Sequence, residues 1–284
     1  MSTKAPLESR RQLEAAATTR PAVGSQPSGR RTRTHTPAVA GAQTARFHRI
    51  LPATLWTREW LLTLGRPRSA AIKVAMPLVL SVPLVSGGAP TFWAGMLLTV
   101  LVAMVGAVGS GVALARARSG GLLARLAVVP RAPSRLAGEW VLAATAVDTV
   151  QMLPVAAVVV ASHPSASAAL ALLACIPAVL LFTNALGCAL SLLADGPGEV
   201  LLDVMVVLAP LLFLGGLFTG VPREGWRWVA ARLDPFAYLH AAFTGALGGV
   251  ASFSAAEVLV AAAVTASISL AALAAVGRAL LARA

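Results

Sequence analysis

The stretch LARARSGGLLARLAVVPRAPSRLAGEW, residues 114–140, is the most informative part of the sequence because it is a charged segment between two long apolar runs. Within it, Leu122, Leu126 and Val129 fall at positions i, i+4 and i+7, which places them on one edge of a helix. A Gly-Gly pair precedes this edge and two prolines follow it, which gives the helix a free start and a fixed end. An ordinary basic loop would need the arginines but not the apolar spacing. We therefore predict a short amphipathic helix that lies parallel to a membrane and docks into a groove on a soluble partner.

The composition of the whole chain is that of a membrane protein. Hydrophobic residues make up 57% of the 284 residues, charged residues only 12%, and the mean hydropathy is +0.79. A soluble domain carries about 25% charged residues. The apolar residues occur in long uncharged runs rather than in alternating or amphipathic stripes. The sequence therefore predicts an all-α polytopic membrane protein.

Six of the apolar runs are long enough to cross a bilayer as helices. The predicted spans are 69–87, 91–114, 138–161, 168–193, 201–219 and 253–276. The connections between spans one and two, and between spans three and four, are very short, so we expect two tight helical hairpins.

The orientation follows from the distribution of Arg and Lys, which are enriched in cytoplasmic segments. With the N-terminus inside, twelve basic residues precede the first span, five lie in the 115–137 loop and two follow the last span, whereas only three lie outside. Both termini and the 115–137 loop are therefore predicted to be cytoplasmic. Because nearly all basic residues are arginine and alanine is abundant, we expect the plasma (inner) membrane of a GC-rich bacterium.

The N-terminal segment differs from the rest of the chain. Residues 1–60 hold ten basic residues against three acidic ones, and the first 45 residues show no core-forming pattern. The net charge of +12 suggests nucleic acid, but a basic tail ahead of a span is what cytoplasmic retention and anionic lipid favour. We therefore predict a disordered basic cytoplasmic tail over residues 1–45, a six-span domain over 46–284, and membrane lipid rather than nucleic acid as a partner.

The run from Arg116 to Trp140 resembles the cytoplasmic loop of ABC-2-type transporter permeases, where an acidic-Arg-x-x-Gly-Thr, leucine-rich stretch leads into a Pro-x-Ser-Arg turn. The residues that fit this spacing are Gly120, Leu122, Leu126, Pro130, Ser134, Arg135 and Gly138. Two positions depart from it, because Ala115 or Ala117 replaces the leading acidic residue and Gly121 replaces the threonine.

In that family the loop inserts into a cleft of the ATPase subunit and transmits its closure. The resemblance therefore implies an ATPase-docking set in this chain, with a geometry that differs in detail because of the two departures. The set consists of Arg118, Gly120, Leu122, Arg125, Leu126, Pro130 and Arg135.

The region 211–249 also resembles this family, at the end of span five and the external re-entrant hairpin before span six. Gly216 and the hairpin residues occupy matching positions; the hairpin residues are Pro222, Pro235, Phe236 and Tyr238. The family often has an arginine shortly after that tyrosine, and this chain has His240 and Ala241 instead. The resemblance covers roughly residues 50–284.

The resemblance implies a permease subunit of an ABC exporter, in which the cytoplasmic loop is the coupling helix. It implies a second permease copy, in a homodimer or a heterodimer, and two ATPase subunits that bind the ATP and Mg²⁺. The chain has no Gly-rich phosphate loop with Gly-Lys-Ser/Thr, so we predict no ATPase site, no metal and no cofactor of its own. The expected cargo is a hydrophobic drug, a lipid or a glycan-type molecule, and a role in antibiotic resistance would follow from the first of these.

Three polar residues inside the predicted spans are candidates for the substrate pathway. Asp148 and Gln151 share a face of span three at i and i+3, and Asn184 lies in span four. An ionisable residue inside a membrane is costly and marks either a pathway or an inter-helix contact, here with Lys73 as a possible partner of Asp148. Asn184 is expected to bond a neighbouring helix rather than cargo.

An alternative function is a stand-alone proton-coupled carrier that uses Asp148. Such carriers commonly contain internal repeats and several ionisable residues along a path, and the sequence has one such aspartate and no evident repeat. Two integral-membrane enzyme classes, CDP-alcohol phosphotransferases and intramembrane serine proteases, are disfavoured because the required aspartate set and buried Ser–His pair are missing from the sequence.

Overall fold

The computed structural model describes residues 55–65, 67–123 and 132–282, and these residues form helices with no strand. The helices are α3 (Leu55–Gly65), α4 (Pro67–Ser86), α5 (Thr91–Ser119), α7 (Pro133–Ser162), α8 (Ala166–Ser191), α9 (Pro197–Leu214), α10 (Trp226–Leu233), α11 (Pro235–Ala246) and α12 (Ala255–Ala282). The all-α prediction is confirmed for this part of the chain. The predicted tail, residues 1–45, lies outside it.

Five helices, α5, α7, α8, α9 and α12, are long and apolar enough to cross a membrane. The predicted first span corresponds to α4, which contains Arg68, Lys73 and two internal prolines and does not meet this criterion alone. It does so only together with α3, and the two helices are bent by 74° against each other. The structure therefore contains five candidate spans, or six if the bent α3–α4 pair is one broken span.

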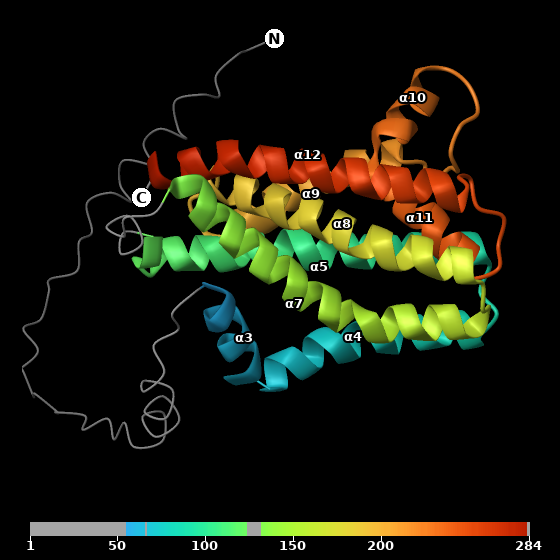
Figure 1. The fold of residues 1–284 in the computed structure, drawn as a ribbon, viewed down its shortest axis with the longest axis horizontal. Coiled ribbons are helices and arrows are strands. Elements are labelled where there is room, and N and C mark those ends of the chain that lie inside the picture. Colours follow the sequence, from blue (N-terminus) through green and yellow to red (C-terminus); the bar gives the residue numbers. More distant parts are fainter. Residues whose placement is uncertain (1–54, 66, 124–131, 283–284) are drawn as a thin grey trace, which may run out of the picture. The chain divides into compact units, whose positions relative to one another are not determined.

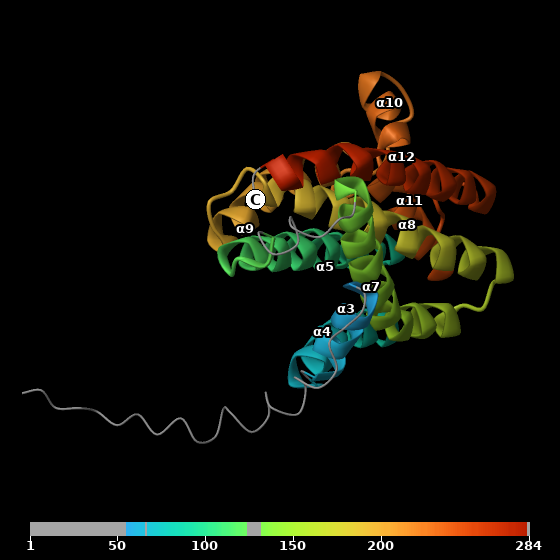
Figure 2. The same ribbon diagram turned by 60° about the vertical axis from the view of Figure 1, so that its left-hand side comes forward.

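The helices form a bundle in which α8 is central, because it packs against α5, α7, α9, α11 and α12. Figure 1 shows α5, α8, α9 and α12 side by side, while α7 crosses them and carries α4 on its other side. Figure 2 gives the same arrangement from a second direction. The central helix accordingly has buried residues along most of its length, from Ala171 to Ser191.

Glycines allow the closest approach in this bundle, between α5 and α8. A Cβ atom on Gly187 would fall on the carbonyl group of Ala107, and one on Gly106 would fall on the side chain of Thr183. Small residues at such crossings let membrane helices pack backbone to backbone, which is the main source of their association in lipid. The α5–α8 pair is therefore the rigid centre of the fold.

Two sets of connections lie at opposite ends of the bundle. One set, here called the loop end, comprises the connection from α5 to α7 and the turn from α8 to α9; the other, the hairpin end, comprises residues 87–90, 163–165 and 215–254. The connections at 87–90 and 163–165 are as short as the sequence predicts. The 115–137 loop is shorter than predicted, because α5 continues to Ser119 and α7 begins at Pro133. Arginine is a good helix former, so the helices continue past the apolar runs.

Candidate functional site

Arg118, in the last turn of α5, holds the C-terminal end of α8. Its Nη1 donates a hydrogen bond to the Ser191 carbonyl oxygen at 3.1 Å, and its Nη2 donates to the Ala194 carbonyl oxygen. The last carbonyls of a helix lack intrahelical donors and carry the negative end of the helix dipole, so a guanidinium is a favourable partner for them. Arg118 therefore fastens the start of the predicted docking loop to the α8–α9 turn.

Two further predicted docking residues lie at the start of the α5–α7 connection. Gly120 caps α5 by donating its backbone N–H to the Arg116 carbonyl oxygen at 2.9 Å. Leu122 is half-buried and packs against a small apolar cluster that contains Leu123 and Trp140. The first turn of the predicted amphipathic segment is thus attached to the bundle.

The remaining docking residues divide into one exposed residue and three that lie beyond the described part. Arg135 is in the first turn of α7, its side chain is 73% exposed, and its Nε lies 3.4 Å from Glu139 Oε1. Arg125, Leu126 and Pro130 fall in residues 124–131, which the structure does not describe. The amphipathic docking helix therefore stays a prediction.

The α8–α9 turn presents an exposed surface beside the Arg118 hydrogen bonds. Leu193, between the two residues whose carbonyls Arg118 holds, is 68% exposed. Asp195 and Glu199 are exposed as well, and the Asp195 N–H donates to Glu199 Oε2 at 2.6 Å. An exposed leucine next to carboxylates and arginines is a chemically mixed surface of the kind that soluble partners bind.

A buried polar node joins α5, α7 and α8 in the middle of the bundle. The Ser110 hydroxyl donates to the backbone carbonyl of Asn184 at 2.9 Å. Asn184 Nδ2 in turn lies 3.3 Å from Thr145 Oγ1 and 3.2 Å from Asp148 Oδ2, and it donates to both. The structure thus brings together two of the three predicted pathway residues, Asp148 and Asn184, as inter-helix partners.

Gln151, the third predicted pathway residue, is buried but is not part of this node. Its Oε1 has no hydrogen-bond partner within the described residues. The salt bridges within the described residues do not join Lys73 of α4 to Asp148. No group of three or more His, Cys, Asp or Glu side chains there is arranged to hold a metal ion.

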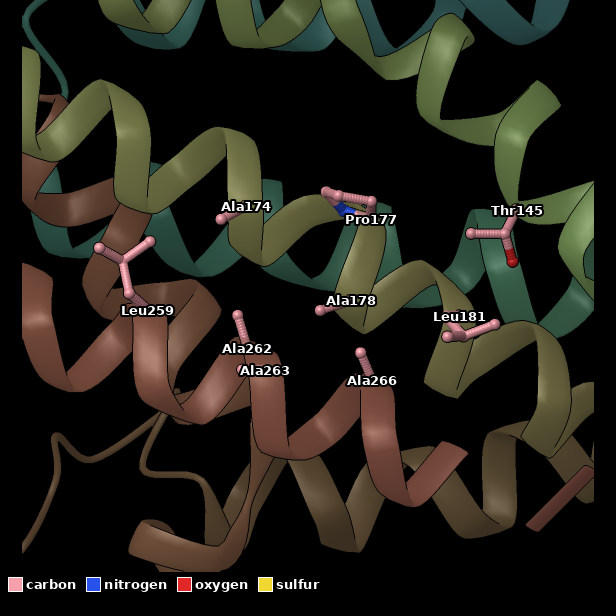
Figure 3. Close-up of a pocket in the computed structure, with 9 residues that line it drawn as sticks. All are labelled: Thr145, Ala174, Pro177, Ala178, Leu181, Leu259, Ala262, Ala263 and Ala266. Atoms are coloured by element: carbon pink, nitrogen blue, oxygen red, sulfur yellow. The ribbon is translucent and has the colours of Figure 1, made fainter. Parts of the chain in front are cut away.

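An open apolar groove of about 400 Å³ lies between α8 and α12, next to the polar node (Figure 3). Its lining residues are Thr145, Ala174, Pro177, Ala178, Leu181, Leu259, Ala262, Ala263 and Ala266. The alanines leave the space between the two helices unfilled, and the only side-chain oxygen in the lining is the Thr145 hydroxyl, which belongs to the node. Small-molecule sites commonly occupy about 300–1,000 Å³ and are mostly apolar. The groove therefore offers space for an apolar group beside the polar node.

The predicted hairpin consists of α10 and α11, which are separated by Asp234. Asp234 Oδ1 accepts a hydrogen bond from the Phe236 N–H at 2.9 Å, and Pro235 occupies the first position of α11. This is the usual cap of a helix that begins with proline. Burial raises the pKa of Asp234 to about 7, although the backbone N–H groups of Phe236 and Gly215 oppose the shift. Oδ2, which faces Gly215, forms no hydrogen bond of normal geometry.

The other hairpin residues connect α11 to its surroundings. Phe236 is fully buried, and its ring lies 5.9 Å from that of Phe182 in α8. The Tyr238 hydroxyl donates to the Arg232 carbonyl oxygen at 2.9 Å, and its ring stacks on Phe253 at 4.4 Å. Pro222 is half-buried and precedes α10.

His240 connects α11 to the start of α5, near the position where the permeases that this chain resembles often have an arginine. Its Nε2 lies 3.0 Å from the Phe92 carbonyl oxygen at the start of α5, and it packs edge-on against the Phe92 ring at 4.8 Å. Burial lowers the pKa of His240, so the neutral ring with the proton on Nε2 is the form that donates to this carbonyl. The contact joins α11 to α5.

Sequence reasoning missed two residues in key contacts, Asp234 and Ser110, and the contacts of a third, Arg118. Asp234 could have been found, because an Asp-Pro pair before an apolar segment is a helix start signal. Ser110 and the Arg118 contacts could not, because their partners lie about 75 residues away along the chain. Such partners are set by helix packing and leave no local pattern.

Comparison with protein families gives one match, which agrees with the fold. The family model described as "ABC-2 type transporter" matches residues 53–247, more than half of the chain. No curated protein and no solved structure is similar enough to be matched. The matched region runs from α3 to the end of α11 and includes the loop end, the polar node and the hairpin. The chain therefore belongs to the ABC-2 type transporter family and is a multi-pass membrane protein, the permease of an ABC transporter whose ATPase is a separate partner subunit.

Proposed function

We propose that this permease is half of the membrane pathway of a bacterial ABC exporter, with its loop end in the cytoplasm. Two such chains, in a homodimer or a heterodimer with a related permease, bind two ATPase subunits. The ATPases hydrolyse ATP with Mg²⁺, and this chain carries the cargo across the inner membrane. The observation that carries the proposal is the family match together with the distribution of arginine, which is concentrated at the loop end and the termini.

The loop end supports this proposal because it offers an exposed surface for a partner and a hydrogen-bonded connection between α5 and α8. Arg135, in the first turn of α7, and Leu193, in the α8–α9 turn, are both exposed at this end. Arg118 links the end of α5, which leads into the predicted docking helix, to backbone carbonyls at the end of α8 and in the α8–α9 turn. A displacement of the docking helix by the ATPase would thus act on α5 and on α8, the central helix, at the same time.

The cargo is proposed to be a hydrophobic drug, a lipid or a glycan-type molecule, with the first two preferred. The groove between α8 and α12 supports an apolar cargo because its lining offers a single hydroxyl and no charge. A glycan would require several hydrogen-bonding groups, which the groove does not supply.

The experiment that tests the proposal is co-expression with the ATPase encoded beside the gene, followed by purification through a tag on the permease. A stable complex with vanadate-sensitive ATPase activity is the expected result. A permease that is well folded but free of any ATPase would contradict the proposal.

The same preparation tests the docking helix. Leu126→Asp places a charge on the predicted apolar edge, so it should abolish co-purification of the ATPase while the permease stays in the membrane. Leu193→Asp is the matched change on the α8–α9 turn, and it should weaken the complex as well if that turn is part of the surface. Unchanged co-purification of the Leu126→Asp variant would reject the docking role.

A stand-alone proton-coupled carrier is the second function that the sequence leaves open. The contact of Asp148 with Asn184 favours a packing role for this aspartate over a role in proton transfer. A purified chain without ATPase that moves protons or cargo in vesicles, and loses this activity in Asp148→Asn, would favour the carrier.

A further inference from the structure

Helix α10 carries an exposed apolar stripe that no other described element covers. Trp226, Val229 and Leu233 are 70%, 50% and 80% exposed. They fall at i, i+3 and i+7 and so share one face of the helix. Ala231, on the opposite face, is fully buried. Exposed side chains of this size in a segment that does not span the membrane call for a partner.

Two arginine contacts fix the level of α10 relative to the spans. The Arg227 guanidinium lies over the ring of Phe213 at 5.2 Å, in the last turn of α9, and its Nη2 donates to Thr219 Oγ1 at 2.9 Å. Arg232 pairs with Glu257 at 3.0 Å, in the first turn of α12. Both neighbours are ends of candidate spans. The helix is thus fixed where two spans leave the apolar layer.

Figures 1 and 2 show that α10 projects sideways from the bundle, beyond α12, rather than continuing the direction of the spans. An element that projects sideways at the level where spans end meets the boundary between lipid headgroups and acyl chains. The composition fits that boundary, because tryptophan prefers the interface and arginines at this depth reach the headgroups. Trp228, under the Arg232 guanidinium at 4.7 Å, adds a second indole.

We propose that α10 is an interfacial helix that lies in the headgroup region of the leaflet at the hairpin end, with Trp226, Val229 and Leu233 inserted among the acyl chains. The occupant of the stripe is membrane lipid. Amphipathic helices of this type bury their apolar face about 5–10 Å into the headgroup–acyl boundary. The hairpin is thereby held from outside the bundle by lipid as well as from inside by α11. The proposal does not depend on the ATPase or on the cargo.

The experiment uses the full chain in lipid nanodiscs with an environment-sensitive fluorophore on an introduced cysteine. Val229→Cys and Leu233→Cys report on the stripe. Glu224→Cys, exposed just before α10, is the water-facing control, and Ile268→Cys, 61% exposed in α12, is the control within a span. The chain without an introduced cysteine is the control for labelling of the native Cys175 and Cys188, which are free and buried.

Two quenchers separate the possible surroundings of the label. Lipids brominated near the top of the acyl chain should quench positions 229 and 233 strongly, and lipids brominated near the chain end should quench them less. A water-soluble nickel chelate should quench position 224 more than either of them. Position 268 should show quenching by lipid only.

Two outcomes would overturn the proposal. Strong quenching of both stripe positions by the nickel chelate, with little quenching by brominated lipid, would place the stripe in water. Protection from both quenchers would place it against protein, as expected for a second copy of the chain. Each variant should first match the unmodified chain in elution volume and Tm, and the two labelled stripe positions must agree.

Discussion

The two ends of the bundle are built differently. At the hairpin end, α11 is enclosed by α5, α8 and α12, and its two phenylalanines, Phe236 and Phe243, are fully buried. At the loop end, the apolar cluster is smaller, and three of its members, Leu123, Leu136 and Trp140, keep 6–9% of their surface exposed. The loop end relies in addition on polar contacts to backbone carbonyls.

This difference indicates what each end can do. A tightly packed end has few alternative arrangements, whereas an end held by hydrogen bonds and small apolar contacts can shift when a partner binds. The loop end also leaves charged and apolar side chains exposed, which a partner can cover. The difference therefore agrees with a permease that receives a push at one end and keeps its hairpin fixed at the other.

The largest expected effect comes from removing a packed ring at the hairpin end. Phe236→Ala should destabilise the protein by about 3–5 kcal/mol, because it leaves a cavity between α11 and α8. Thermal unfolding of the purified permease in detergent would measure the change in Tm. Arg135→Ala, at an exposed loop-end position, is the control and should stay within about 0.5 kcal/mol of the parent. An equal decrease in Tm in the two variants would contradict the difference in packing between the two ends.

A smaller effect is expected at the loop end from Arg118→Ala. The variant loses the charge-assisted hydrogen bonds to carbonyls of the α8 end, which together should cost about 1.5–3 kcal/mol because the side chain is only half-buried. Arg118→Lys should restore part of the stability, because an ammonium group can reach one carbonyl but not both in the same geometry. If Arg118→Ala unfolds at the same temperature as the parent, the hydrogen bonds between α5 and the end of α8 do not contribute to the stability of the fold.

A third prediction uses pH to examine the hairpin end. The folded state raises the pKa of Asp234 from the ordinary value of 3.8 to about 7, so it binds the proton more tightly than the unfolded chain does. The resulting stabilisation is present at low pH and is lost as the pH rises from 3.8 to about 7. Asp234→Asn keeps a capping side chain but cannot titrate. The Tm of the parent minus that of this variant should therefore decrease between pH 5 and pH 8.

Asp234→Ala serves as the control for the cap itself. It removes the hydrogen bond to the Phe236 N–H and, relative to Asp234→Asn, should cost about 1 kcal/mol at any pH. A Tm difference between the parent and Asp234→Asn that stays constant from pH 5 to pH 8 would show that Asp234 does not titrate in this range.

The smallest expected effect lies between the two ends, at the polar node. Asp148→Asn can still accept a hydrogen bond from Asn184, so its Tm should nearly equal that of the parent. Asp148→Leu removes the acceptor and should cost about 0.6 kcal/mol, the average for inter-helix hydrogen bonds in membranes. ATPase activity of the co-purified complex is the second measurement, and a large loss in Asp148→Asn with unchanged Tm would indicate a role beyond packing.

Much of the fold could be predicted from local composition. The apolar runs locate α5, α7, α8, α9 and α12, because a membrane requires each spanning helix to be long and uncharged. The hairpin, in contrast, was expected from the family resemblance and not from local composition. The ends of α5 and α7 were placed wrongly by several residues, since a helix that leaves the apolar layer can continue with arginine in it.

The helical class, most of the spans and the family resemblance follow from the sequence, because these depend on residue type and spacing along the chain. Only the three-dimensional structure shows that Asp148 meets Asn184, that Arg118 binds the end of α8, and that the apolar stripe of α10 stays uncovered. Each of these depends on which helix faces get packed together. Packing in turn depends on small contacts such as Gly187 against Ala107, which have no signature in hydropathy.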